Sequence, residues 1–416
     1  MKRITLINHS DTKGGASVVS YRLMKALCNL GVDARMVVVD KQTANPRVDT
    51  VGSPMAVRTA FLAEHADIWL HNGFNRDTVF KISIGRFGLP VEKHPWVLDS
   101  DAIILNWVNQ GMMSLDSVAR LCARDIPVAW TMHDMWNMTG VCHHAGTCTR
   151  YMAGQHCGNC PLIDGGKHRK DLSSSVEDRK KKLYDGPGSK IKFVAVSNWL
   201  AGCARRSMLM EDSDLTVIPN AFPVEDFTPK PKYSRRELHL PEGRLIVMGA
   251  ARLDDPIKNL PLAIETLNRT AGRVPDAVAV LFGEIREPAL LQDLKMPYRH
   301  LGTITDKARL ASVYGHASAV LSTSRYETLP GTLVEGISAG AMAVTTGHGG
   351  QADIVTDGVN GFIRDSDAQA LSDALTEALE NPADRQAQHT SMARKFAAPE
   401  VATAYLRLLF GDRFLR

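Results

Sequence analysis

The sequence predicts an α/β protein in which open parallel sheets form two or three domains. Its 416 residues are too many for one ordinary domain. Near the start, an apolar strand over 4–8, a helical segment and a strand over 34–39 form a βαβ unit. The segment 317–350 repeats this alternation of buried strand, loop, helix and strand. Such alternation is typical of parallel sheets that are covered by helices.

The other elements follow the same two periodicities. Further strands are predicted at 102–107, 128–132, 192–196, 245–248, 278–282, 319–321 and from 343 onward. Helices are predicted at 175–184, 199–209, 262–268, 306–314 and 401–410. Pro223, Pro229 and Pro231 indicate a linker between domains. Residues 41–98 give mixed signals, with helical spacing over 55–69 and Gly/Pro punctuation over 82–95.

The composition is that of a soluble globular protein. The charged fraction of 23% is ordinary, and a net charge of +4 is too small for this length to favour nucleic acid. Asn8 and His9 interrupt the first apolar run too early for a signal peptide, and no apolar stretch approaches the ~18 residues of a spanning helix. We expect a cytoplasmic protein whose membrane contact, if any, is peripheral and on the inner face of the plasma membrane. The basic run Lys180–Lys182 is one candidate for such contact, although most such runs are solvated.

Two glutamates lie eight residues apart in the segment 317–350. Glu327 follows a strand, and Glu335 lies in the first turns of the helix that Pro330 and Gly331 open. Ligands of open α/β sheets bind at strand carboxyl ends, and helix N-termini favour anions. Carboxylates only accept hydrogen bonds, so they suit the hydroxyls of a sugar or ribose whose phosphate sits on the helix end. The alternative is that Glu327 is an ordinary helix-start acid and Glu335 a solvated side chain.

Cations and glycines at two other strand ends suit a phosphate ligand. Arg252 and Lys258 follow the strand 245–248 and could neutralise a diphosphate, the arginine bidentately and the lysine as a point charge. Gly14 and Gly15 follow the first strand and let backbone approach a ligand closely. The loop lacks the G-x-G-x-x-G fingerprint, which disfavours nicotinamide or flavin chemistry. The alternatives are two exposed surface cations and a plain tight turn.

A histidine and an aspartate end the strand 128–132. Neutral histidine offers one donor and one acceptor, so His133 could contact a sugar. The alternative is an ordinary structural pair in which Asp134 fixes His133.

Four of the seven cysteines are clustered. Cys142, Cys148, Cys157 and Cys160 have the spacing C-x5-C-x8-C-x2-C. In a reducing compartment, clustered thiols more often ligate zinc than form disulfides. Four thiolates would close a tetrahedral site with no position for water, so we expect any such zinc to be structural. The first spacing is longer than in common zinc knuckles, and the choice between metal and disulfides stays open.

Two motifs resemble those of one enzyme family. Glu327-Thr-Leu-Pro-Gly-Thr-Leu-Val-Glu335 is similar to the E-x7-E signature of the retaining glycosyltransferases often called family 4, which have the GT-B fold. The run from His133 to Ile163, with HDMWNMTGVC and CGNCP, resembles a subgroup from bacterial exopolysaccharide clusters that includes the colanic-acid type.

The resemblance implies two Rossmann-like domains that face each other across a cleft. Residues 1–225 would form an acceptor domain with a Cys-rich insertion at 142–160. Residues 226–398 would form the donor nucleotide-sugar domain, and a C-terminal helix over 399–416 would pack back on the first domain.

The resemblance also implies a reaction, the retaining transfer of a hexosyl group from a nucleoside diphosphate sugar to a hydroxyl of a glycan or lipid-linked glycan. The catalytic residues would be His133 beside the donor sugar, Arg252 and Lys258 on the departing diphosphate, and Glu327 on the sugar hydroxyls. The donor-binding residues would be Gly14, Gly15, Gly283, Leu329, Pro330, Gly331, Thr332 and, on the ribose, Glu335. No cofactor is required for catalysis, and the only expected metal is the structural zinc.

The chain departs from the family pattern at three positions. Leu329 replaces a usual Phe, Gly331 a common Asn or other residue, and Asn106 a frequent His. The first two would lie beside the donor, so they bear on donor identity more than on reaction type. Three rival functions are a glycoside hydrolase with two carboxylates, a nucleotide-sugar epimerase on the same fold, and a non-enzymatic zinc-bearing scaffold of a polysaccharide assembly complex.

Overall fold

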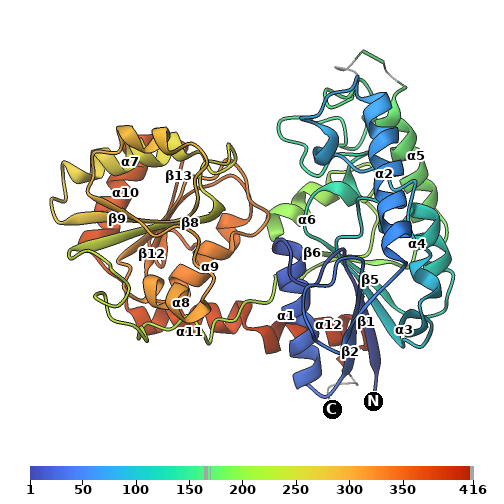
Figure 1. Cartoon of the computed structure of the whole chain (residues 1–416), viewed down its shortest axis with the longest axis horizontal. Coiled ribbons are helices and arrows are strands. Elements are labelled where there is room, and N and C mark those ends of the chain that lie inside the picture. Colours follow the sequence, from blue (N-terminus) through green and yellow to red (C-terminus); the bar gives the residue numbers. More distant parts are fainter. Residues whose placement is uncertain (164–166, 169, 413–416) are drawn as a thin grey trace. The chain divides into compact units, whose positions relative to one another are not determined.

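The computed structural model describes residues 1–163, 167–168 and 170–412, and it divides the chain into two compact units. Unit 1 comprises Met1–Ala221 and the segment from Val401 onward, and unit 2 is Phe222–Glu400. The first stretch of unit 1 thus ends shortly before the predicted border at 225/226. Figure 1 shows a sheet with flanking helices in each unit, so the predicted α/β class is confirmed.

The sheet of unit 1 has seven strands in its described part, all parallel, in the order β3-β2-β1-β4-β5-β6-β7. They are β1 (Arg3–Ile7), β2 (Asp33–Val38), β3 (Val48–Thr50), β4 (Ala102–Leu105), β5 (Val128–Met132), β6 (Lys192–Ala195) and β7 (Leu215–Val217). β4 and β5 are buried along their whole length, the pattern of a parallel sheet covered on both faces. Because the strands are parallel, the residues that follow β1, β4 and β5 meet at one edge of the sheet.

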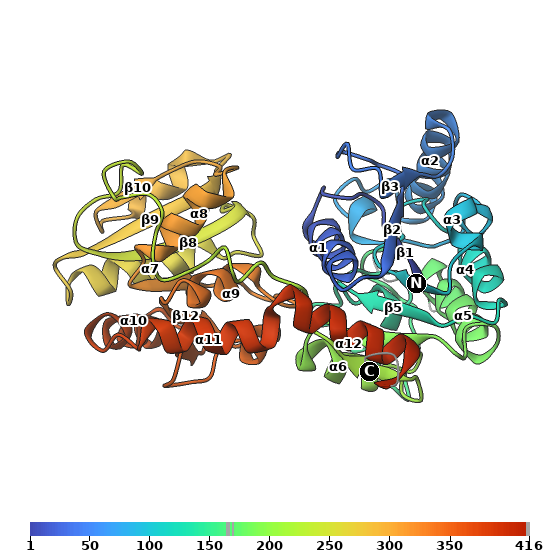
Figure 2. The ribbon, with the colours of Figure 1, turned by 90° about the horizontal axis from the view of Figure 1, so that it is seen from below.

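The helices of unit 1 are α1 (Gly15–Asn29), α2 (Pro54–His71), α3 (Pro95–Leu98), α4 (Leu115–Cys122), α5 (Leu172–Asp185), α6 (Asn198–Arg205) and α12 (Ala398–Phe410), with short 3-10 turns η1 (Val79–Lys81), η2 (Val91–Lys93) and η3 (Trp136–Met138). In Figure 2, α1 lies on one side of β1 and β2, and α3 and α4 lie on the other. Tyr405 of α12 shares a hydrogen bond of 2.8 Å with Thr131 of β5, through their hydroxyl groups.

The mixed signals of residues 41–98 correspond mainly to α2. Ser53 caps this helix by accepting a hydrogen bond of 3.2 Å from the N–H of Ala56, and Pro54 occupies its first turn. The eighteen residues of α2 make it the longest helix in the described residues of unit 1.

The basic run on α5 differs from the prediction. Lys180 is completely buried, and its Nζ donates to the carbonyl oxygens of Trp136 and Thr139 while lying 3.6 Å from the centroid of the Trp136 ring. Burial lowers the pKa of Lys180 to about 7. Lys180 therefore ties α5 to the loop 136–139 and cannot serve as a surface cation.

The sheet of unit 2 has six described strands, again all parallel, in the order β10-β9-β8-β11-β12-β13. They are β8 (Arg244–Arg252), β9 (Ala277–Glu284), β10 (Tyr298–His300), β11 (Ala319–Ser322), β12 (Met342–Thr346) and β13 (Gly361–Arg364). β8 continues past the predicted 245–248 to Arg252, with irregular pairing between Gly249 and Arg252. This irregularity places Arg252 at the carboxyl end of the strand.

The helices of unit 2 are α7 (Leu260–Ala271), α8 (Lys307–Gly315), α9 (Gly331–Ser338), α10 (Ala368–Glu380) and α11 (Arg385–Phe396), with the 3-10 turns η5 (Pro288–Asp293) and η6 (Gly350–Asp353). Apolar residues of α7 and α10 form one buried cluster with the central strands. Figure 1 shows α7 on one side of β8 and α8 and α9 on the other. Within the described parts of both units, no helix has the length and apolar character needed to cross a membrane.

Candidate active site

The loops that follow β8 and β11 are tied together in unit 2. The hydroxyl of Thr323 donates to the carbonyl oxygen of Lys258 at 2.9 Å, and the N–H of Arg325 donates to the carbonyl oxygen of Ile257 at 2.7 Å. These bonds hold Lys258 against the loop that carries Glu327. The Lys258 ammonium forms an ion pair with Oε1 of Glu327, which also accepts from the hydroxyl of Ser324 at 3.0 Å.

Arg252 lies on the same loop system. Its Nη2 donates to Oδ2 of Asp255 at 3.1 Å, and the carbonyl oxygen of Asp255 accepts from the N–H of Lys258 at 2.8 Å. Burial raises the pKa of Tyr326, and the negative charges of Asp255 and Glu327 raise it further. The phenol of Tyr326 therefore lies close to both carboxylates. The structure thus brings together three of the predicted catalytic residues: Asp255 bonds to Arg252 and to the backbone of Lys258, and Lys258 pairs with Glu327.

The backbone of Glu327 is fixed by a glycine turn after β12. The N–H of Gly350 donates to the carbonyl oxygen of Glu327 at 2.8 Å. Gly349 has a φ of 141°, and a Cβ placed on it would lie 2.1 Å from the same carbonyl oxygen. Only glycine fits there, because any side chain would push Glu327 away.

The predicted donor residues around α9 are arranged along its first turns. Pro330 caps α9 without a side-chain hydrogen bond from the described residues, so backbone N–H groups from Gly331 onward can receive an anion. Leu329 is buried, whereas Thr332 and Glu335 are half-buried. Glu335 lies inside the helix, and its charge adds to burial in raising the pKa of Tyr314 well above the ordinary value.

The predicted donor-site glycines have different surroundings. Gly14 caps α1 with a φ of 94°, and no described atom lies within 4 Å of a Cβ placed on Gly14 or Gly15. Gly283 at the end of β9 has a φ of 120°, and a Cβ there would lie 2.0 Å from the carbonyl oxygen of Ala250. Packing against β8 therefore requires Gly283, whereas the space beside Gly14 and Gly15 can admit a ligand.

His133 follows β5 in unit 1. Its Nε2 lies 3.2 Å from Oδ1 of Asn106, which follows β4, and burial lowers the pKa of His133 to about 4. The ring is therefore neutral at pH 7. Because an amide oxygen can only accept, Nε2 carries the proton and Nδ1 is the acceptor of the ring.

Asp134 does not fix His133 as the structural alternative supposed. Its Oδ2 lies 2.7 Å from Nδ1 of His143 and accepts from Nε1 of Trp107 at 2.9 Å, and its Oδ1 accepts from the N–H of Trp136 at 2.8 Å. Burial alone would raise the pKa of Asp134, but His143 and the Trp136 N–H outweigh it and lower that pKa to about 2. Asp134 is therefore a structural carboxylate at the entrance to the Cys-rich segment.

The Asp134–His143 pair should stabilise the fold in a pH-dependent way. The pKa of Asp134 is lower in the folded chain than its ordinary value of 3.8, so its contribution is complete above pH 3.8 and is lost as the pH falls toward 2. We expect Asp134→Asn to remove roughly 2 kcal/mol of that acid-sensitive stability. Urea unfolding of the wild type and the variant between pH 5 and pH 2 measures it. The exposed Asp125→Asn should follow the wild type, and parallel curves for Asp134→Asn and the wild type would contradict the role of Asp134.

The predicted four-cysteine zinc site finds no support in the structure. Among the described residues, which include all four cysteines, no three His, Cys, Asp or Glu side chains form a group that could hold a metal ion. Cys157 Sγ accepts from the N–H of Gly140 at 3.3 Å, and burial, with smaller contributions from Cys160 and Cys148, raises the pKa of Cys142 to about 11. Lys180 and the Asp134–His143 pair hold this segment instead.

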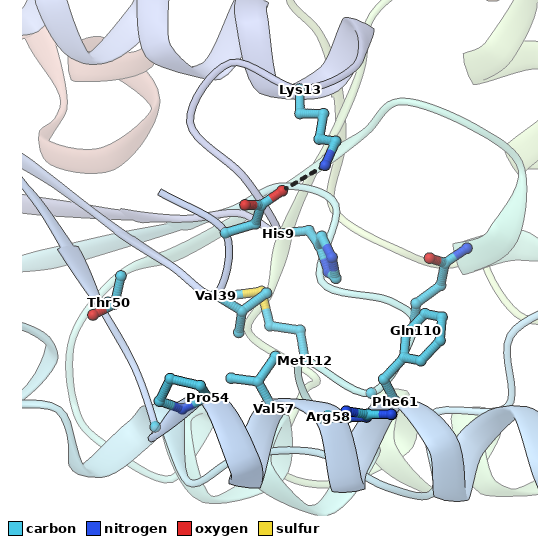
Figure 3. A pocket seen from close by; sticks show the side chains of 13 residues that line it. His9, Lys13, Val39, Thr50, Pro54, Val57, Arg58, Phe61, Gln110 and Met112 are labelled. Carbon is cyan, nitrogen blue, oxygen red and sulfur yellow. Dashed lines mark hydrogen bonds and ion pairs between the residues drawn. The ribbon is translucent and has the colours of Figure 1, made fainter. Parts of the chain in front are cut away.

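A cavity of about 480 Å³ lies in unit 1 beside the ends of β1 and β2. Its lining includes polar groups of His9, Lys13, Asp40, Thr50, Arg58 and Gln110, and apolar groups of Val39, Pro54, Val57, Phe61 and Met112. Figure 3 labels all of these except Asp40. Lys13 Nζ donates to Oδ2 of Asp40 at 3.3 Å across one side. Burial lowers the pKa of His9, so its ring is neutral at pH 7. Such a mixture of donors, acceptors and an aromatic ring suits a sugar or another polyhydroxylated ligand.

Residues 232–396, most of unit 2, match the family described as glycosyl transferases group 1. The chain is a glycosyltransferase, and its unit 2 carries the group 1 match. The match includes Arg252, Lys258, Glu327 and Glu335, and it removes the alternative of a non-enzymatic scaffold. WcaC of Escherichia coli K12, a glycosyl transferase assigned to colanic acid biosynthesis, is 24% identical over 359 residues, which is 80% of either chain.

Solved structures show that this glycosyltransferase has the predicted GT-B fold. The sucrose-phosphate synthase of Thermosynechococcus elongatus has a TM-score of 0.67 and 17% identity, covering 100% of this chain and 99% of its own. HepE of Anabaena, solved in complex with UDP and glucose, has a TM-score of 0.61 and 15% identity. The match covers 98% of this chain and 99% of the HepE chain.

The sequence analysis did not predict several residues of the unit 2 site. Asp255, Ser324 and Tyr326 contact or surround the predicted cations and Glu327, yet each belongs to a residue type that is common on surfaces. The available signal was their position, because all three lie within three residues of a predicted site residue.

Proposed function

We propose that the protein moves a hexosyl group, with retention of configuration, from a nucleoside diphosphate sugar to a hydroxyl of a glycan or lipid-linked glycan. The observation that carries this proposal is the convergence of Arg252, Lys258 and Glu327 on adjoining loops at the strand ends of unit 2. UDP is the first nucleotide to test, because HepE was solved with UDP. A role in exopolysaccharide biosynthesis is supported by the similarity to WcaC and by the Cys-rich segment.

The two cations neutralise the departing diphosphate. Lys258 is ion-paired with Glu327 and Arg252 with Asp255, so a bound diphosphate would replace a carboxylate at each cation with phosphate oxygens. Glu327 could then hold sugar hydroxyls, and the α9 N–H groups near Pro330 would add to the charge stabilisation. Charge that develops on the leaving group during transfer is thus met by preorganised donors.

No side chain is assigned as a covalent nucleophile. Front-face attack by the acceptor hydroxyl leaves the diphosphate as the base that receives the proton. A glycoside hydrolase would need two carboxylates on either side of the bond, whereas Glu327 is engaged by Lys258 and Glu335 lies inside α9. The arrangement therefore favours transfer.

The acceptor is proposed to bind in the cavity of unit 1. His9, Lys13 and Gln110 offer hydrogen bonds to hydroxyl groups there, and Phe61 offers an apolar face to a sugar ring. The contact of His133 with the donor sugar is proposed from the family resemblance.

Calorimetry with UDP and with GDP tests the diphosphate site. We expect Arg252→Ala to weaken binding at least about tenfold, because it removes a charge-assisted contact worth about 1.5–3 kcal/mol. Arg269→Ala is the matched control, since Arg269 lies in the same unit and pairs with the exposed Glu265 at 2.8 Å. Wild-type affinity for both nucleotides in Arg252→Ala would refute the assignment.

Product analysis separates the remaining alternatives. Transfer requires both donor and acceptor. An isomerised nucleotide sugar that forms without acceptor would indicate an epimerase, and free sugar released from a nucleotide-free glycan would indicate a hydrolase. A screen of UDP-, GDP- and dTDP-sugars identifies the donor.

A further inference from the structure

One region of unit 1 exposes large apolar side chains. Eleven large hydrophobic residues are exposed in the described structure, and six of them lie within residues 55–80. Their exposed fractions range from 41% for Trp69 to 79% for Met55. We call this set the α2 patch: Met55, Leu62, Trp69, Leu70, Phe74 and Phe80. The other five are scattered singly, which is ordinary for a protein surface, whereas a cluster calls for an explanation.

The patch follows one face of α2. Met55, Leu62 and Trp69 are seven residues apart, so they form a single stripe along the helix. The buried residues of α2, Glu64, His65 and Ile68, lie away from this stripe. Figures 1 and 2 show α2 at the periphery of unit 1. The usual polarity of a surface helix is thus absent on the outer face of α2.

Two aromatic residues beyond α2 extend the patch. The ring of Phe74 lies 5.1 Å from that of Trp69, nearly perpendicular, and the ring of Phe80 lies 5.0 Å from that of His65. Phe74 has a φ of 62°, a left-handed conformation that bulky residues rarely adopt. Its N–H donates to the carbonyl oxygen of Trp69 at 3.1 Å, so the backbone itself keeps this ring on the surface beside Trp69.

The charges around the patch are mostly positive. Arg58, which also lines the cavity of Figure 3, is the single exposed Arg, Lys, Asp or Glu of α2 in the described structure. Arg76, Lys81 and Arg86 are exposed beside it, whereas Asp67 is largely covered and pairs with Arg86 at 3.1 Å. Asp77 is the remaining exposed acid in this region of the described chain. The patch therefore combines apolar and aromatic groups with a cationic rim.

We propose that the α2 patch docks on a lipid surface that carries anionic headgroups. Trp and Phe side chains beside Arg and Lys are typical of helices that lie in the membrane interface, with the apolar face in the acyl boundary and the cations among the headgroups. A stable protein interface uses about 20–30 residues on each side, far more than these six side chains. The other side of α2, through Pro54, Val57 and Phe61, lines the cavity seen in Figure 3. One helix would thus contact the lipid surface and line the proposed acceptor site.

Sedimentation of the full chain with vesicles tests the proposal without any nucleotide sugar, so its outcome is separate from that of the proposed transfer reaction. The wild type should bind vesicles of phosphatidylcholine with phosphatidylglycerol more tightly than vesicles of phosphatidylcholine alone, and less tightly at high salt. Leu62→Gln, Leu70→Gln and Phe74→Asn combined should weaken binding at least about tenfold. Asparagine suits the left-handed backbone at position 74, so this variant should fold.

The matched control changes three exposed apolar residues outside the patch, Leu30→Gln, Leu98→Gln and Val359→Gln, and should bind vesicles like the wild type. Circular dichroism and UDP binding should be the same for all three proteins. No vesicle binding by the wild type would overturn the proposal, and so would undiminished binding by the patch variant. Self-association in ultracentrifugation that the patch variant abolishes, without vesicle binding, would assign the patch to a second copy of the chain instead.

Discussion

Lys258→Ala should lower kcat about 10²–10³-fold, the usual effect of removing one preorganised group that stabilises developing charge. The Thr323 and Arg325 hydrogen bonds hold the backbone at Lys258 and Ile257, and the Lys258 ammonium is ion-paired with Glu327. In the proposed reaction it meets the charge that grows on the departing diphosphate. Initial rates of nucleoside diphosphate release at saturating donor and acceptor measure the effect.

Two further variants make this result specific. Lys258→Arg keeps the charge but not the compact ammonium, so it should restore part of the lost rate. Lys295→Ala removes an exposed cation elsewhere in unit 2 and should turn over like the wild type. If Lys258→Ala retains a rate within a few-fold of the wild type, Lys258 does not stabilise the leaving group.

Gly349→Ala should impair both stability and turnover. The new Cβ would lie 2.1 Å from the carbonyl oxygen of Glu327, and the φ of 141° is one that alanine rarely adopts. The strain should cost on the order of 1–3 kcal/mol of folding free energy. Because the backbone of Glu327 must move away, kcat/KM should fall about 10²-fold, as expected for a displacement near 1 Å. Thermal unfolding and steady-state kinetics measure the two effects.

Gly272→Ala provides the comparison for this variant. Gly272 has a φ of −68°, and the nearest atom to its added Cβ, the carbonyl oxygen of Arg269, lies at an ordinary 3.6 Å. This variant should therefore match the wild type in stability and kcat/KM. Equal kinetics for Gly349→Ala and Gly272→Ala would show that the Gly349 turn does not position Glu327.

The sequence by itself determined the class of the fold and the places where ligands could bind. Strand and helix periodicities act over a few residues, so the alternation of elements is visible without tertiary contacts. The carboxyl ends of parallel strands share one edge of a sheet, so Arg252, Lys258, Glu327 and His133 could be singled out by their positions after strands. The length of β8 was underestimated, because an irregular pairing with β9 carries that strand on to Arg252.

Tertiary structure alone decided the partners of these side chains. Lys258 and Glu327 are 69 residues apart, and their pairing depends on β8 and β11 being neighbours in the sheet. The alternative to a sugar contact of His133 was a pair with Asp134, but His133 contacts Asn106 and Asp134 contacts His143. The sugar contact itself stays a prediction. Cysteine spacing predicted a zinc site, but the described side chains form no group of three that could hold a metal ion. The α2 patch also emerged only from the fold, since spacing shows that a helix is apolar but not which of its faces the rest of the chain covers.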